Sequence, residues 1–529
     1  MGQGFLLLLI CAPRARRRWR GELNVLLITT DQQRADSIGA YGNSVCQTPN
    51  LDRLASEGTR FDACRTQNPY CQPSRATILT GQYPSTHGVV SNGVDAPDDL
   101  AEHSLAKLLG EAGYTTGIIG KAHFASTYPV LPTGKIESVE GSASVPEDWN
   151  GPYFGFDHAE LLLFGHMLRI APLMGMWNWC YGPPPFGLHY ARWLFRDGKG
   201  ADKVRLMQPE AAGATWDKTQ TWRNQLPEEE HPTTWVADRA IEWIKNSMRS
   251  GKPFFGWISF ADPHHPMDAP LPWCDMYDPM DVPLPEKRPD EFESKNAFHR
   301  MWGQGALEGS GFEWANPGGA NLSDAQLAKM IAGYYGMVSQ LDSAIGRIMS
   351  TLDELGIAEG TLVVMTSDHG EFLGDHQMLF KGPLHYEGLL RVPLIVRGPG
   401  FRANEVNDEP VGTIDLVPTI LDSVGQAIPD DVEGTRLLSG DREHVLTENN
   451  HKMVFELPLR TITTHRYKLT RTLMNDDIGE LFDLEDDPGE FVNRWSDPAS
   501  ASLKSDLLAT LDDVMNHDVR EEPMVGVVA

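Results

Sequence analysis

Residues 24–30 read Asn-Val-Leu-Leu-Ile-Thr-Thr, and the polar pair Asp31-Gln32 follows at once. A short, continuous apolar run that is rich in β-branched residues is typical of a strand buried on both faces. Strands of this kind occur mainly in parallel sheets that helices cover. We therefore expect an α/β fold built around this strand.

The pattern of strand and helix continues along the next 400 residues. Within the predicted helix at 323–355, Leu327, Met330, Ile331 and Tyr334 share one face. The alternation indicates a large, mostly parallel mixed sheet sandwiched by helices. The other predicted helices lie at 49–57, 104–112 and 234–248, and the other predicted strands at 114–119, 253–260, 361–366 and 392–396.

From about residue 430 the pattern changes to short strand-like runs, an acidic turn and one last helix at 502–515. This predicts a smaller C-terminal α+β unit with an antiparallel sheet. The runs lie at 444–446, 459–464 and 467–472. We divide the chain into an N-terminal extension (1–21), an α/β domain (22–429) with an insertion at about 125–235, and a C-terminal α+β subdomain (430–529).

The chain of 529 residues carries 73 acidic and 45 basic side chains, a net charge of −28. Non-specific nucleic-acid binding requires Lys and Arg to displace phosphate counterions, so this charge argues against it. An anionic substrate would have to be drawn in by a local positive site.

The N-terminal apolar run at 5–12 is far shorter than the ~20 residues that span a bilayer. Its positive charges follow the run, whereas a secretory signal places them before it. We interpret 1–21 as a dispensable extension, with a signal peptide as the alternative.

The six cysteines form no CxxC pair, which favours a reducing compartment. We expect a cytoplasmic protein that contacts no membrane, with export as the alternative.

The insertion at 125–235 is the least regular part of the sequence, and Gly, Pro, Trp and Met crowd together at 174–186. Loops of this length are usually functional. The segment is either a wall of the substrate pocket or a surface that packs against a partner subunit. The exposed-looking Trp and Met residues lead us to expect a homodimer or a higher homo-oligomer.

Four of the predicted strands lead directly into polar, reactive side chains. Ligands of open α/β sheets bind beyond the carboxyl ends of the strands, so parallel neighbours would unite these groups in one metal-and-anion site. The donors at two of the ends are mostly hard oxygen atoms with one imidazole, which favours Ca²⁺, with Mn²⁺ or Mg²⁺ as alternatives. The groups are Asp31 and Gln32, then Lys121 and His123, then Asp262, His264 and His265, and finally Asp368 and His369.

A second cluster reads Cys71-Gln-Pro-Ser-Arg75 and ends six residues later at Gly81. Pro73 suits the first turn of a short helix and Gly81 its C-terminal end. Cys71 would then lie just before a helix N-terminus, where the dipole favours an anion and lowers the pKa of a thiol. A buried structural cysteine is the alternative.

With these motifs in place, the sequence resembles the formylglycine-dependent (type I) sulfatases of the alkaline phosphatase superfamily, above all arylsulfatases and phosphonate monoester hydrolases. The resemblance covers about residues 22–495. It rests on six ordered motifs: Cys71-Gln-Pro-Ser-Arg75, Leu79-Thr-Gly81, Gly120-Lys121 with His123, Pro263-His264 with Pro266, Ser367-Asp-His-Gly-Glu371 with Lys381, and Glu480-Leu-Phe-Asp-Leu484 with Asp487-Pro488 and Asn493.

The resemblance implies an alkaline phosphatase-like fold and a sulfuric ester hydrolase. A formylglycine-generating enzyme oxidises Cys71 in this family, and the hydrated aldehyde attacks sulfur through a metal-bound hydroxyl. The small-molecule substrate would be an aryl or alkyl sulfate. The implied metal ligands are residue 71 together with Asp31, Gln32, Asp368 and His369.

The resemblance also implies roles for the other side chains. Lys121 and Lys381 neutralise charge on the transferring oxygens, and His264 protonates the leaving alcohol. His123 takes the proton from the second hydroxyl, which expels sulfate and restores the aldehyde. Arg75 orients the diol. Asn92 contacts the ester, as Lys121, His264 and Lys381 also do.

Two positions depart from the pattern of many relatives, which carry Asp-Asp instead of Asp31-Gln32 and Asn instead of His369. Phosphonate monoester hydrolases share the Gln and the His, whereas the pair Lys121 and His123 favours a sulfatase. Hydrolysis of phosphonate monoesters or phosphate diesters by the same nucleophile is therefore the alternative activity. A non-catalytic binding protein that keeps Cys71 unmodified is a third.

Overall fold

A computed structural model describes most of the chain. The described residues are 22–127, 129–162, 188–293, 295–305, 318–440, 442–451, 456–515 and 519–526. The predicted extension at 1–21 and the segment rich in Trp and Met at 174–186 lie outside these residues.

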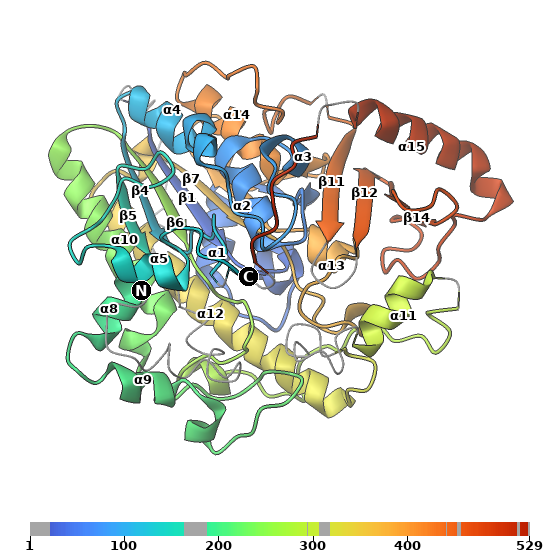
Figure 1. The fold of residues 1–529 in the computed structure, drawn as a ribbon, viewed down its shortest axis with the longest axis horizontal. Helices are drawn as coiled ribbons and strands as arrows, with labels where there is room; N and C mark the ends of the chain where they lie inside the picture. The colour runs from blue at the N-terminus through green and yellow to red at the C-terminus, as the bar shows by residue number, and fades with distance from the viewer. Residues whose placement is uncertain are drawn as a thin grey trace, which may run out of the picture.

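The larger part of the molecule is built on an eight-stranded mixed sheet (Figure 1). Seven strands run parallel to one another, and β8 runs antiparallel to both of its neighbours. In spatial order the strands are β5 (His158–Leu161), β4 (Thr115–Gly120), β6 (Phe254–Ser259), β1 (Asn24–Thr30), β7 (Thr361–Ser367), β8 (Leu394–Arg397), β2 (Thr59–Phe61) and β9 (Glu405–Asn407).

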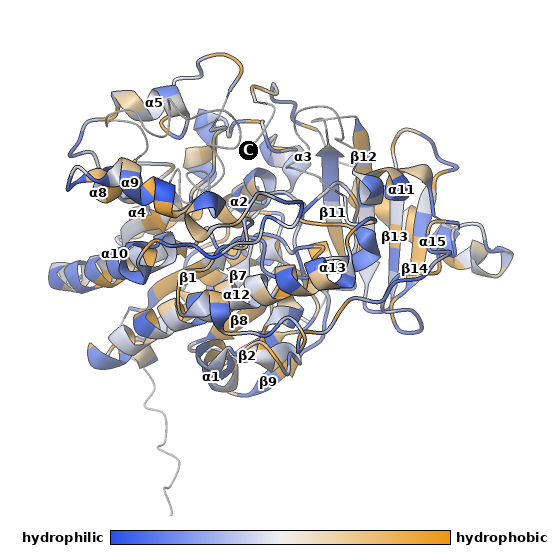
Figure 2. Ribbon diagram, turned by 90° about the horizontal axis from the view of Figure 1, so that it is seen from below, coloured by the Kyte–Doolittle hydropathy of each residue, from blue (hydrophilic) through white to orange (hydrophobic). Residues whose placement is uncertain are grey.

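The buried centre of the sheet explains why its strands were recognisable in the sequence. Every residue of β1 and β7 is buried, so both strands are continuous apolar or Thr-rich runs. The predicted strand at 24–30 coincides with β1. Figure 2 shows the apolar colouring of these central strands between the more polar outer elements.

Helices cover both faces of the sheet, as the α/β pattern predicts (Figure 1). The 31-residue helix α12 begins with a capping box in which Ser323 and Gln326 bond each other's backbone N–H groups. One face carries α1 (Pro49–Glu57), α10 (Pro232–Ser247) and α12 (Asp324–Glu354); the other carries α2 (Cys71–Thr80), α4 (Leu105–Glu111) and α14 (Leu416–Ser423). Shorter helices are α3 (Pro84–His87), α5 (Val139–Ser144), α8 (His189–Phe195), α9 (Gly200–Leu206), α11 (Ala297–Gln304) and α13 (Glu387–Leu390).

The C-terminal part forms a separate antiparallel sheet against which helix α15 (Ala501–Val514) packs (Figure 1). This arrangement confirms the predicted α+β unit. One of its strands, β14, was not predicted as a strand. The sheet contains β11 (His444–His451), β12 (Leu457–Thr464), β13 (Tyr467–Thr472) and β14 (Gly479–Asp483). The domain boundaries themselves remain a prediction.

The insertion at 125–235 contains more regular structure than the sequence suggests. Strand β5 pairs in parallel with β4 and extends the main sheet at its edge. With four residues, β5 is too short to show a periodic pattern.

A second small sheet joins β3 (Cys64–Arg65) to β10 (Val411–Gly412). Among the described residues, no helix combines the length and the apolar character needed to cross a bilayer.

Candidate functional site

The sheet order brings together the strand ends that carry the reactive side chains. Strands β4, β6, β1 and β7 are consecutive parallel neighbours. Their carboxyl ends therefore lie at one edge, which is the condition for a single site. Lys121, Asp31 and Asp368 each follow directly on the last residue of a strand.

A compact group of buried donors occupies this edge of the sheet. One donor atom from each of Asp31, Cys71, Asp368 and His369 lies within 4.8 Å of the other three. The Sγ atom of Cys71 is 3.2 Å from Nε2 of His369 and 3.7 Å from Oδ1 of Asp31. The fold thus unites residues that are more than three hundred positions apart in the chain.

The donor set fits a hard divalent cation. Gln32 donates its amide N–H to the Glu371 carboxylate, and its buried Oε1 atom has no hydrogen-bond partner among the described residues. An amide oxygen without a hydrogen-bond partner, together with the carboxylates of Asp31 and Asp368, makes a suitable set of ligand types for Ca²⁺, Mn²⁺ or Mg²⁺. His369 donates from Nδ1 to the carbonyl of Gly370 at 2.8 Å, which leaves Nε2 directed to the cluster.

Arg75 forms hydrogen bonds both to the carboxylates of the cluster and to residues at the ends of β4 and β6. Its side chain is fully buried, and Nε donates to Oδ2 of Asp368 at 2.9 Å. The guanidinium also bonds Oδ2 of Asp31 at 3.4 Å, Oγ of Ser259 at 2.7 Å and the carbonyl of Lys121 at 2.8 Å. Removing one partner of a buried ion pair costs about 3–5 kcal/mol, so Arg75 is important for the order of the site.

Two lysines and a histidine surround the cysteine. The Nζ atom of Lys381 lies 2.9 Å from Sγ of Cys71 and 2.9 Å from Nε2 of His264. His264 donates from Nδ1 to the carbonyl of His265 at 2.7 Å. Lys121 forms an ion pair with Asp31. Lys381 therefore links the cysteine to the histidine.

These cations favour negative charge inside a buried site. Burial opposes ionisation of Asp31, but Lys121, Arg75 and Lys381 outweigh it and hold the pKa of this carboxyl well below its usual range. Burial and Asp31 both oppose a thiolate at residue 71, yet Lys121 and Lys381 lower the pKa of the Cys71 thiol. The site is thus electrostatically prepared for an anionic group at this position.

Helix α2 begins at Cys71 itself, two residues earlier than Pro73 suggests, and Tyr70 is its flanking residue. Gly81 ends the helix in a left-handed conformation (φ 71°), as predicted. The side-chain oxygen of Asn92 accepts the backbone N–H of Gln72 at 3.0 Å and so satisfies a free donor in the first turn. The contact of Asn92 with an ester remains a prediction.

His123 adopts a left-handed backbone conformation (φ 58°) in the chain that follows β4. Its side chain is buried, and neither ring nitrogen has a hydrogen-bond partner among the described residues. Burial, reinforced by Lys121 and Arg75, holds the pKa of His123 well below its usual range. The imidazole is therefore neutral, and both ring nitrogens lack a hydrogen-bond partner among the described residues.

The structure shows contacts of four residues to which the sequence interpretation gave no individual role: His265, already counted among the strand-end groups, and Glu371, Ser259 and Glu137. His265 and Glu371 flank the side-chain amide of Gln32. Both lie inside the recognised motifs, which is a signal that could have revealed them. Ser259 ends β6 and Glu137 lies in the insertion, and no pattern in the sequence marks either one.

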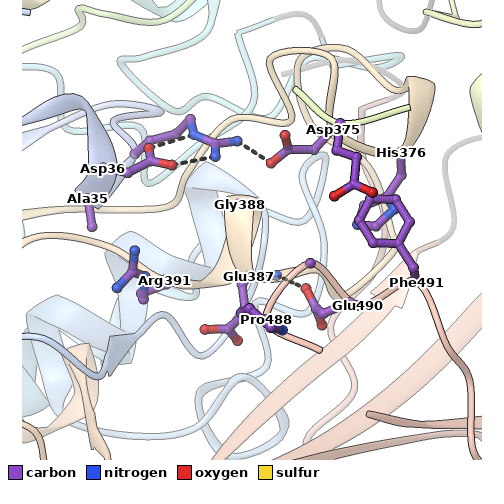
Figure 3. Close-up of a pocket in the computed structure, with 13 residues that line it drawn as sticks. Ala35, Asp36, Asp375, His376, Glu387, Gly388, Arg391, Pro488, Glu490 and Phe491 are labelled. Atoms are coloured by element: carbon purple, nitrogen blue, oxygen red, sulfur yellow. Dashed lines mark hydrogen bonds and ion pairs between the residues drawn. The ribbon is translucent and has the colours of Figure 1, made fainter. Parts of the chain in front are cut away.

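A separate cavity of about 230 Å³ lies elsewhere, beside α13 and residues 488–491 (Figure 3). None of the predicted catalytic residues lines it. Arg34 pairs there with Asp36 and Asp375 at 2.6 Å each. Glu490 accepts the backbone N–H of Glu387 at 2.7 Å. The charged groups of this cavity thus have structural partners, and the strand-end cluster is the better candidate site.

Comparisons with known proteins find relatives over most of the chain. The family model described as "Sulfatase" matches residues 23–426, and "N-sulphoglucosamine sulphohydrolase, C-terminal" matches residues 374–517. An arylsulfatase of Clostridium perfringens is 32% identical over 89% of each chain. The multifunctional alkaline phosphatase superfamily protein PehA of Trinickia caryophylli is 31% identical over 91% of this chain and 93% of its own.

A solved structure with a similar fold is the phosphonate monoester hydrolase of Agrobacterium radiobacter. It superposes with a TM-score of 0.74 at 25% identity and covers 93% of this chain and 96% of its own.

Proposed function

As the chain belongs to the sulfatase family of hydrolases in the alkaline phosphatase superfamily, we propose that it cleaves aryl or alkyl sulfate monoesters. One observation carries this proposal: Cys71 begins a helix inside a cluster of hard metal ligands and within reach of Lys381. Cys71 is also the first residue of the motif Cys71-Gln-Pro-Ser-Arg75, whose cysteine the resemblance implies to be oxidised.

The family implies a formylglycine at residue 71 and one divalent cation, which together supply an oxygen nucleophile and neutralise its charge. Asp31, Gln32, Asp368 and His369 would hold the cation, and their oxygen-rich set favours Ca²⁺. Formation of the aldehyde requires a formylglycine-generating enzyme as a maturation partner. Assembly into a homo-oligomer is part of the same proposal.

The chain's own side chains then provide charge and proton transfer. Lys121 and Lys381 bind the non-bridging oxygens of the sulfuryl group and stabilise the charge that develops on them. His264, whose Nε2 atom lies 2.9 Å from Nζ of Lys381, protonates the leaving alcohol. His123 would accept the proton released when sulfate departs, because its ring nitrogens have no hydrogen-bond partner among the described residues.

The second candidate is hydrolysis of phosphonate monoesters or phosphate diesters by the same nucleophile. Two observations favour it. Gln32 makes the metal site one unit less negative than a second aspartate would, and a phosphonate monoester hydrolase is among the solved structures with this fold.

Comparison of kcat/KM for 4-nitrophenyl sulfate and phenyl 4-nitrophenylphosphonate distinguishes the two candidates. Both substrates release the same chromophore, so differences in leaving group do not enter. We expect the sulfate to be preferred. A preference for the phosphonate by two or more orders of magnitude would replace the first proposal with the second.

A further inference from the structure

Glu137 lies in the insertion and contacts the backbone of the chain at His123. Its Oε2 atom accepts the backbone N–H of His123 at 2.6 Å, and its Oε1 atom accepts that of Phe124 at 2.8 Å. The hydroxyl of Tyr153 donates to the same carboxylate. Glu137 is 3% exposed, so water does not compete for these bonds.

The backbone at His123 needs such support. A residue with a Cβ atom rarely adopts a left-handed conformation, and φ of His123 is 58°. Its ring makes no hydrogen bond to the described residues, so the direction of the imidazole follows from the backbone and from packing. The neighbouring Phe124 ring packs against Phe154, with ring centroids 4.9 Å apart.

A carboxylate is the side chain that these contacts require. All three groups that face Glu137 are donors, and a carboxylate offers acceptors at both oxygen atoms. A glutamine of the same shape would place an NH₂ group opposite one of the backbone N–H groups. Glu137→Gln therefore disturbs the backbone at His123 without removing volume.

We propose that Glu137 is a positioning residue that holds the imidazole of His123 where it accepts the proton in the second half of the reaction. The inference rests on the proposed function. In that second half, a base removes the proton of the free hydroxyl at residue 71, the C=O bond forms again, and the C–O bond to sulfate breaks. No oxidant or reductant is needed, and water then rehydrates the aldehyde.

The test is rapid mixing of the mature enzyme with 4-nitrophenyl sulfate. The first turnover of 4-nitrophenol release measures the first half of the reaction, in which the sulfuryl group is transferred to residue 71. The steady-state rate measures whichever half is slower. For Glu137→Gln we expect the first-turnover rate to stay within about twofold while the steady-state rate falls about tenfold or more. Acid-quenched Glu137→Gln protein should retain the sulfuryl group, a mass about 80 Da above that of the hydrated aldehyde at residue 71, as His123→Ala should.

Glu140→Gln is the matched control, because Glu140 is exposed on the following helix. It should leave both phases and the mass unchanged. A purely structural role of Glu137 predicts an equal loss in both phases without retained mass, and this result would overturn the inference. An unchanged steady state would overturn it as well.

Tyr153→Phe removes a donor to Glu137 and decides the question if Glu137→Gln does not fold. We expect Tyr153→Phe to lower the steady-state rate more than the first-turnover rate, though by less than Glu137→Gln does. An equal loss of both rates would then refute the inference. A wild type that prefers phenyl 4-nitrophenylphosphonate refutes the proposed function separately. The two phases measured with that substrate would then decide the role of Glu137.

Discussion

Replacement of Cys71 by alanine should abolish turnover of sulfate esters, with kcat lower by about four orders of magnitude or more, because it removes the nucleophile. The residual rate would come from the lysines and the cation alone. Steady-state hydrolysis of 4-nitrophenyl sulfate measures the effect. The thermal midpoint should change little, because alanine fits the first turn of α2.

Cys64→Ala is a stringent control, since Cys64 and Cys71 are both free and buried. Cys64 lies in β3, and burial and Asp415 raise the pKa of its thiol, in contrast to that of Cys71. We expect Cys64→Ala to keep kcat within about twofold of the wild type. Comparable losses of kcat in both variants would show that residue 71 does not supply the nucleophile.

Replacement of His264 by alanine should depend strongly on the leaving group. A poor leaving group such as an alkyl alcohol needs a proton as it departs, whereas 4-nitrophenolate does not. General acid catalysis contributes about 10²–10⁴-fold, so kcat/KM should fall by about 10³-fold for an alkyl sulfate and about tenfold for 4-nitrophenyl sulfate. The measurement is the dependence of log kcat/KM on the pKa of the leaving alcohol, which should become steeper.

His103→Ala serves as the control for this series, because His103 is exposed and pairs with Asp431 away from the strand ends. It should leave the dependence on the leaving group unchanged. If His264→Ala lowers kcat/KM equally for all leaving groups, His264 does not act as the acid. Its bond to Lys381 would then point to a purely positional role.

The core strands were predictable because burial on both faces leaves a simple pattern. Strands β1 and β7 stand out as continuous buried runs, and the polar residues that follow them mark the edge of the sheet. The order of strands could not be obtained in this way. Pairing between β1 and β7 joins residues 24–30 and 361–367, and local propensity carries no information over that distance.

The short strands could not be predicted from the sequence for a different reason. Strands β2, β3, β5, β9 and β10 contain two to four residues each, and their position depends on contacts with the longer strands. Glu137 is similar, because its importance arises only where the fold places it beside the backbone of His123. Such residues become visible only in the three-dimensional structure.

The account depends most on the chemical state of residue 71 next to the cluster of Asp31, Asp368 and His369. Mass spectrometry of the peptide that contains residue 71, isolated from fully active protein, tests this directly. Replacement of the sulfur by an aldehyde oxygen should lower the peptide mass by about 18 Da. An intact thiol in protein that turns over sulfate esters at full rate would contradict the account.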